Sequence, residues 1–83
     1  MQIKKITKPK KLTYLDRECE VVVYHFDSKS DGNRVCAFRW ADNSDLEITH
    51  IKGDGRTKQF QRFAQVIIPN GTQADVDAFI NNI

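Results

Sequence analysis

Long apolar runs and cysteine are scarce in this sequence, and both shortages bear on the class and location of the protein. The longest apolar run is Val21–Tyr24, far short of the about 20 residues that a membrane-spanning helix needs. No apolar stretch follows Lys4 and Lys5, so we predict no secretory signal. Two cysteines without such a signal are typical of free thiols in a reducing compartment. We therefore expect a cytoplasmic protein, of a cell or of an infected host.

A strong excess of one charge sign is also missing, although the charge is unevenly distributed. The net charge is +2, too small by itself to indicate a nucleic-acid-binding protein. The first eleven residues nevertheless carry +5 and the rest of the chain −3. The basic residues of this segment are Lys4, Lys5, Lys8, Lys10 and Lys11. We predict that residues 1–13 form a basic N-terminal arm or an edge strand of one small domain that spans residues 1–83.

Three segments rich in β-branched and aromatic residues predict antiparallel strands. They are Glu18–Phe26, Arg34–Ala41 and Leu46–Lys52. The turn-forming clusters Asp27–Asn33 and Asp42–Asp45 separate them, so the strands are expected to follow one another as a meander.

Residues 57–68 fit two patterns. Phe60, Phe63 and Ala64 recur at helical spacing, whereas the β-branched run of residues 66–68 ends at Pro69 and favours a strand. We favour the strand, and the alternative is a helix.

The end of the chain predicts a helix. Thr72 and Asp75 have the spacing of a capping box, and apolar residues then recur every three or four positions from Val76 to Ile83. The predicted fold class is α+β, a small antiparallel meander of four to five strands with a C-terminal helix packed on one face.

The strand registers predict which residues share a face. Pairing Phe26 with Cys36 and Trp40 with Ile48 gathers a set of large apolar residues, which we expect beneath the helix. This set is Val22, Tyr24, Phe26, Cys36, Phe38, Trp40 and Ile48. The second face would carry Val21, Val23, Val35, Ala37 and Ile51, interrupted by His25, Arg39, Glu47 and Thr49. The same registers place Cys19 and Cys36 on different faces of the sheet, so we expect no disulfide between them. They also place His25 and His50 on different faces.

The leading functional hypothesis is a non-catalytic module that docks on a macromolecule, with nucleic-acid backbone slightly favoured. The lysines of the arm would neutralise phosphates. A second basic cluster interleaves with Phe60 and Phe63, a combination that suits backbone tracking and base stacking. This cluster is Lys52, Arg56, Lys58 and Arg62. A second interpretation of the arm is that its lysines only solvate an edge strand, and for Phe60 and Phe63 we favour positions in the core.

The alternative function is a protein-binding inhibitor or adaptor of the type that phages and mobile elements carry. An apolar face with polar interruptions such as Arg39 suits a protein contact or a homodimer. A third hypothesis, a small nuclease or phosphate-binding protein, would use His50, His25 and Lys52, or the glycine-containing loop Gly53–Arg56. Neither a phosphate-binding loop motif nor a zinc spacing occurs, so we predict no enzyme, no metal and no cofactor.

Overall fold

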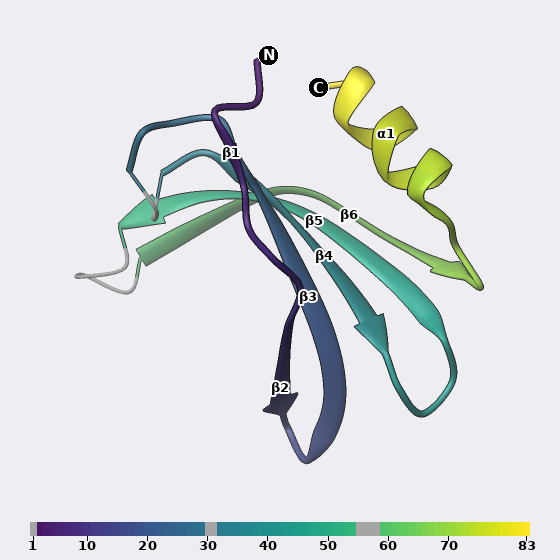
Figure 1. Ribbon diagram of the computed structural model, residues 1–83. Helices are drawn as coiled ribbons and strands as arrows, with labels where there is room; N and C mark the ends of the chain where they lie inside the picture. The colour runs from purple at the N-terminus through teal and green to yellow at the C-terminus, as the bar shows by residue number, and fades with distance from the viewer. Residues whose placement is uncertain (1, 30–31, 55–58) are drawn as a thin grey trace.

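A computed structural model of the chain describes residues 2–29, 32–54 and 59–83. Among these residues, six strands form one open antiparallel sheet that a single helix follows (Figure 1). The elements are β1 (Lys5–Ile6), β2 (Lys10–Tyr14), β3 (Arg17–His25), β4 (Arg34–Trp40), β5 (Asp45–Asp54), β6 (Gln59–Pro69) and α1 (Gln73–Asn81). The predicted α+β class is confirmed.

The basic N-terminal segment supplies the first two strands. Both β1 and β2 pair with β3, so they lie one after the other along the same edge of the sheet. The remaining strands follow in the order β3, β4, β5, β6, which is the expected meander. Within the ambiguous segment, residues 59–68 belong to strand β6, which pairs with β5 from Gln59 to Pro69, whereas residues 57 and 58 lie outside the described residues.

The register between β3 and β4 differs from the prediction by three positions. Cys36 lies opposite Val23 rather than opposite Phe26. The reason is a compact loop: the Phe26 N–H donates to the carbonyl of Asn33 at 2.9 Å, and the Asn33 N–H donates to Asp27 Oδ2 at 2.8 Å. A Cβ on Gly32 would collide with the Asp27 side chain, so a larger residue here would displace the carboxylate that accepts from the Asn33 N–H.

The register between β4 and β5 also differs by three positions. Ile48 lies opposite Ala37 rather than opposite Trp40. Ser44 adopts a left-handed conformation with φ of 61° and donates its N–H to the carbonyl of Trp40 at 2.9 Å, which closes a tight turn.

Both register differences are three residues, an odd number, and side chains alternate between the two faces of a sheet. The first difference therefore exchanges the two faces of β4 relative to the prediction. The second brings the side chains of β5 back to their predicted faces. The predicted helix-side positions in β3 and β5 are therefore correct, but Cys36, Phe38 and Trp40 point away from the helix. The residues that replace them beneath the helix, Val35 and Ala37, had been assigned to the second face.

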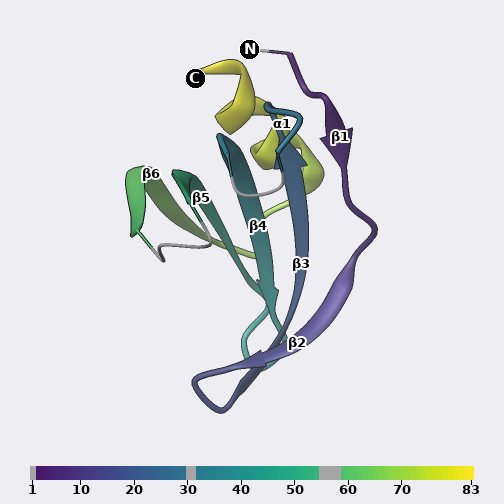
Figure 2. The same ribbon diagram turned by 90° about the vertical axis from the view of Figure 1, so that its left-hand side faces the viewer.

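The core lies between the sheet and α1, which covers one side of the sheet (Figure 2). Its buried cluster is Tyr24, Phe26, Val35, Ala37, Leu46, Ile48, Val76 and Ile80. The predicted capping box at the helix start is present, and the Thr72 N–H donates to the Asp75 carboxylate at 2.7 Å. Gln73 in the first turn donates to the Tyr24 hydroxyl at 3.1 Å, which ties the helix to β3.

Candidate functional site

The side of the sheet that faces away from α1 is called the open face below. Its side chains follow from the registers, since residues directly opposite one another in an antiparallel pair point to the same side. From β3 to β5 they are Cys19, Val21, Val23, His25, Arg34, Cys36, Phe38, Trp40, Glu47, Thr49 and Ile51. Six of them are buried although α1 lies on the other side of the sheet: Cys19, Val21, His25, Cys36, Trp40 and Thr49.

Three cations lie in one row across the open face. Lys5 is opposite His25, and His25 is opposite Arg34. Arg34 is in turn opposite Ile51, which is opposite Arg62. We call Lys5, Arg34 and Arg62 the basic row. Neighbouring strands are about 4.8 Å apart, so the backbone positions of successive members of the row are spaced by roughly 10 Å.

A pocket beside the basic row combines positive charge with an aromatic ring. Arg34, Ile51, Phe60 and Arg62 line this pocket of about 330 Å³. The Arg34 guanidinium carbon is 5.4 Å from the centre of the Phe60 ring. Phe60 keeps 53% of its surface exposed, so the ring remains accessible. The pocket therefore offers cations and a stacking surface to one ligand.

The two arginines of the pocket are oriented by hydrogen bonds. Arg34 Nη1 donates to the carbonyl of Gly32 at 2.7 Å, and Arg62 Nη1 donates to Gln65 Oε1 at 3.0 Å. None of these partners is a carboxylate. Among the described residues, no carboxylate accepts a hydrogen bond from either of these two guanidinium groups.

His25 is buried in the middle of the basic row. Only 6% of its surface is exposed, and among the described residues its Nδ1 has no hydrogen-bond partner. Burial lowers the pKa of His25, and the positive charges of Lys5 and Arg34 lower it further. At neutral pH the imidazole is neutral and adds no charge to the row.

His50 lies on the other side of the sheet, as predicted. Its Nε2 is 2.6 Å from Asn33 Oδ1, and its ring contacts Phe26 and Phe63. Burial lowers its pKa as well. Because the sheet separates the two imidazoles, His25 and His50 do not flank a common substrate site.

Acid should destabilise the fold before the carboxylates titrate. Burial holds the pKa values of His25 and His50 below the usual 6.5, whereas the unfolded chain binds these protons near pH 6.5. The free energy of unfolding is therefore steady above about pH 7 and falls as the pH drops through 6.5. Urea denaturation at a series of pH values measures this, and His25→Gln should flatten part of the slope. A free energy of unfolding that increases as the pH is lowered from about 7 to 5.5 would show that the pKa values of these histidines are not lowered in the folded protein.

The opposite end of the open face is neutralised within the protein. Arg17 Nε is 2.8 Å from Asp42 Oδ2, and the pKa of this carboxyl is lowered by the hydrogen bond from Arg17. The same guanidinium lies 4.2 Å over the Trp40 ring. Positive charge that is free to attract a ligand is therefore concentrated at the end that holds the basic row.

The structure divides the predicted basic residues among several places. Lys5, Lys10 and Arg62 belong to the open face, whereas Lys11 and Lys52 are exposed on the helix side. Lys4 and Lys8 are exposed just before β1 and between β1 and β2. Arg56 and Lys58 lie outside the described residues. Arg34 was not predicted, because only the register shows that it lies beside His25.

Arg39 does not lie on the face to which the sequence analysis assigned it. The reversal of β4 places it on the helix side, where Nη1 donates to the Ser44 carbonyl at 2.9 Å and Nη2 to the Gly71 carbonyl. Arg39 thus joins the turn after β4 to the turn before α1. This position makes it a structural anchor rather than a residue of the open face.

The two phenylalanines of β6 do not lie in the core, so the prediction of core positions for them is wrong. Phe60 and Phe63 expose 53% and 51% of their surfaces. Phe60 contributes to the open face, whereas a bulge opposite His50 and Ile51 directs Phe63 against His50.

Both cysteines are free, as expected, but for a different reason. The reversed β4 puts them on the same face, where Cys19 lies opposite Trp40 and Cys36 opposite Val23. They are therefore separated along the strands and do not bridge. Burial raises the pKa of the Cys36 thiol, which keeps it protonated and unreactive.

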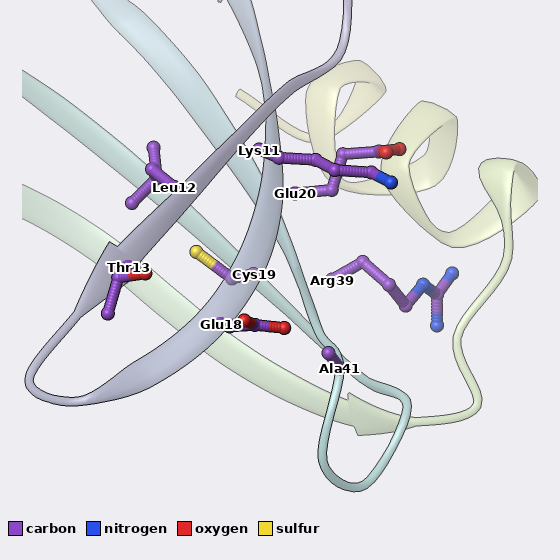
Figure 3. Close-up of a pocket in the computed structure, with 8 residues that line it drawn as sticks. All are labelled: Lys11, Leu12, Thr13, Glu18, Cys19, Glu20, Arg39 and Ala41. Atoms are coloured by element: carbon purple, nitrogen blue, oxygen red, sulfur yellow. The ribbon is translucent and has the colours of Figure 1, made fainter.

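A larger pocket of about 420 Å³ lies at the β2–β3 edge (Figure 3). Figure 3 shows Lys11, Glu20 and Arg39 extending to the helix side, whereas Cys19 points the other way. Glu18 and Glu20 balance Lys11 and Arg39 in its lining. This balance gives the pocket no preference for an ionic ligand.

In the part of the chain that the structure describes, no three histidine, cysteine, aspartate or glutamate side chains gather as a metal site requires. No helix in these ranges has the length and apolar character to cross a membrane.

The comparisons with known proteins identify no relatives. No family model, curated protein or solved structure matches the chain.

Proposed function

We propose that this protein is a non-catalytic module that binds single-stranded nucleic acid across its open face. The observation that carries the proposal is the basic row beside the exposed Phe60 ring. Lys5, Arg34 and Arg62 present three cations on one surface, and no residue directly opposite them in the strand registers is acidic.

The spacing of the row suits a flexible polyanion. A chain of phosphates that crosses the strands meets a cation roughly every 10 Å, and the neutralised phosphates release counterions. Lys10 on β2 extends the positive surface along the edge of the sheet, since it lies opposite Val21 on the same face. The uneven charge of the N-terminal segment is thus placed beside the row.

The aromatic ring favours an unpaired strand over a duplex. Stacking of a base on an aromatic side chain requires a base that has left its own stack, and such contacts contribute about 1–3 kcal/mol each. Phe60 is exposed and already has a guanidinium above its ring, so a base would add to an existing stack.

The test compares two exposed cations on neighbouring strands. Arg62 belongs to the open face and Lys52 to the helix side, so Arg62→Ser and Lys52→Ser change the net charge equally. Affinity for labelled oligo(dT), measured by fluorescence anisotropy, should fall several-fold for Arg62→Ser only. The slope of log affinity against log salt should also decrease by about 0.7 for that variant, as expected for one lost phosphate contact.

Two results would overturn the proposal. Equal losses for Arg62→Ser and Lys52→Ser would indicate attraction by net charge without a site. Undetectable binding to oligo(dT) at about 50 mM salt would exclude nucleic acid and favour the protein-binding alternative for the open face.

A further inference from the structure

The two edges of the sheet are built differently. The edge formed by β1 and β2 is short and interrupted, with strands of two and five residues, exposed lysines and Pro9 between them. Lysines, proline and short strands are the usual means of preventing a second chain from adding to a sheet. The opposite edge, β6, has eleven residues and a single charged side chain, Arg62.

The edge at β6 is open to another strand. Among the described strands, β6 pairs with β5 alone, and Figure 2 shows it at the outer margin of the sheet. Several of its apolar side chains are exposed, including Ile67 with 55% of its surface. A long apolar edge of this type is expected to pair with a further strand.

We propose that two copies of the chain pair through antiparallel β6 edges to form a two-fold symmetric dimer. This inference goes beyond nucleic-acid binding and does not rest on it. The bulge at Phe63 limits regular pairing to residues 64–68. A pair centred on Val66 places Ala64 opposite Ile68 of the second copy, and Gln65 opposite its Ile67.

The charge pattern of β6 suits this self-pairing. Residues 64–68 carry no charge, and Arg62 lies beyond the paired segment, so no like charges face one another. The facing residues on the helix side are all apolar, which continues the core side of each sheet into the next.

The difference between the edges favours a second copy as the occupant. A two-fold antiparallel pair uses the same β6 edge of both chains and leaves only the lysine-protected β1–β2 edges outside. Growth therefore stops at two chains. A strand from an unrelated protein would cover the β6 edge of only one molecule, and the resulting pair would have no two-fold symmetry that ends the assembly at two chains.

The experiment measures mass in solution for the full chain and two matched variants. Light scattering after size exclusion should give twice the chain mass of 9.6 kDa for the wild type. Ile67→Lys places a charge in the β6 edge and should halve this mass. Ile6→Lys changes an isoleucine of nearly equal exposure, 56%, on the protected edge and should leave the dimer intact.

A wild type that stays monomeric as its concentration is raised would overturn the proposal, and so would a dimer that Ile6→Lys dissociates but Ile67→Lys does not. Amide hydrogen exchange provides a second measurement that needs no variant. The amides of residues 64–68 should exchange more slowly as concentration rises, and exchange that is independent of concentration there would also refute the pairing.

Discussion

Replacing Ile48 with alanine should lower the free energy of unfolding by about 2–5 kcal/mol, the largest effect we expect from a single substitution. Ile48 has no exposed surface and lies between Ala37 on β4 and Val66 on β6, beneath the helix. Truncation removes apolar burial and leaves a cavity in the middle of the core cluster. Urea denaturation followed by circular dichroism measures the loss.

The control for this prediction is Ile6→Ala. Ile6 loses the same atoms, but it is 56% exposed on β1, so its truncation should change stability by less than about 1 kcal/mol. Similar losses for the two variants would mean that the core does not lie between the sheet and α1. A domain this small has a total free energy of unfolding of only several kcal/mol. Ile48→Ala should therefore leave part of the protein unfolded at 37 °C.

Replacing Arg39 with methionine should lower the free energy of unfolding by about 2 kcal/mol, the second largest effect expected. Methionine keeps much of the aliphatic stem but loses the hydrogen bonds to the Ser44 and Gly71 carbonyls. Gly71 is buried against Leu46, and its carbonyl would lose a charged donor. The turn before α1 would then be held less firmly, and the helix with it.

Arg62→Met is the matched control, because Arg62 is exposed and, among the described residues, its guanidinium donates a hydrogen bond to Gln65 alone. It should leave stability within about 0.5 kcal/mol of the wild type. If Arg39→Met is equally neutral, the two turns are not joined through this side chain. A charge reversal at Arg39 would likewise act through the helix turn, so it does not test binding at the open face.

The sequence predicted the ends of the strands and of the helix best, because turn-forming residues and helix caps favour one backbone conformation each. The turn before Arg34, the turn after Trp40 and the capping box at Thr72 separated the elements correctly, because glycine, asparagine and aspartate favour turn backbone whatever surrounds them. The segment before Pro69 was harder, since its apolar residues fit a helix and a strand equally. Its β-branched residues decided for the strand.

The sequence was least informative for β4, which is apolar on both faces. Alternation within Arg34–Trp40 separates Val35 and Ala37 from Cys36, Phe38 and Trp40, but it does not say which set faces the helix. The predicted strand registers assigned the larger aromatic set to the core. The structure assigns it to the open face, where Phe38 stacks beside Trp40 and Arg17 covers the indole ring.

The meander, the C-terminal helix and the concentration of lysines at the N-terminus could be predicted from the sequence, because each depends on residues close together in the chain. Which cations lie side by side could be seen only once the strands were paired. The basic row joins residues from β1, β4 and β6, and the loop closures that align them are set by hydrogen bonds at Asn33 and Ser44. A register shift of one residue would move Arg34 to the other face, and no local pattern in the sequence fixes that choice.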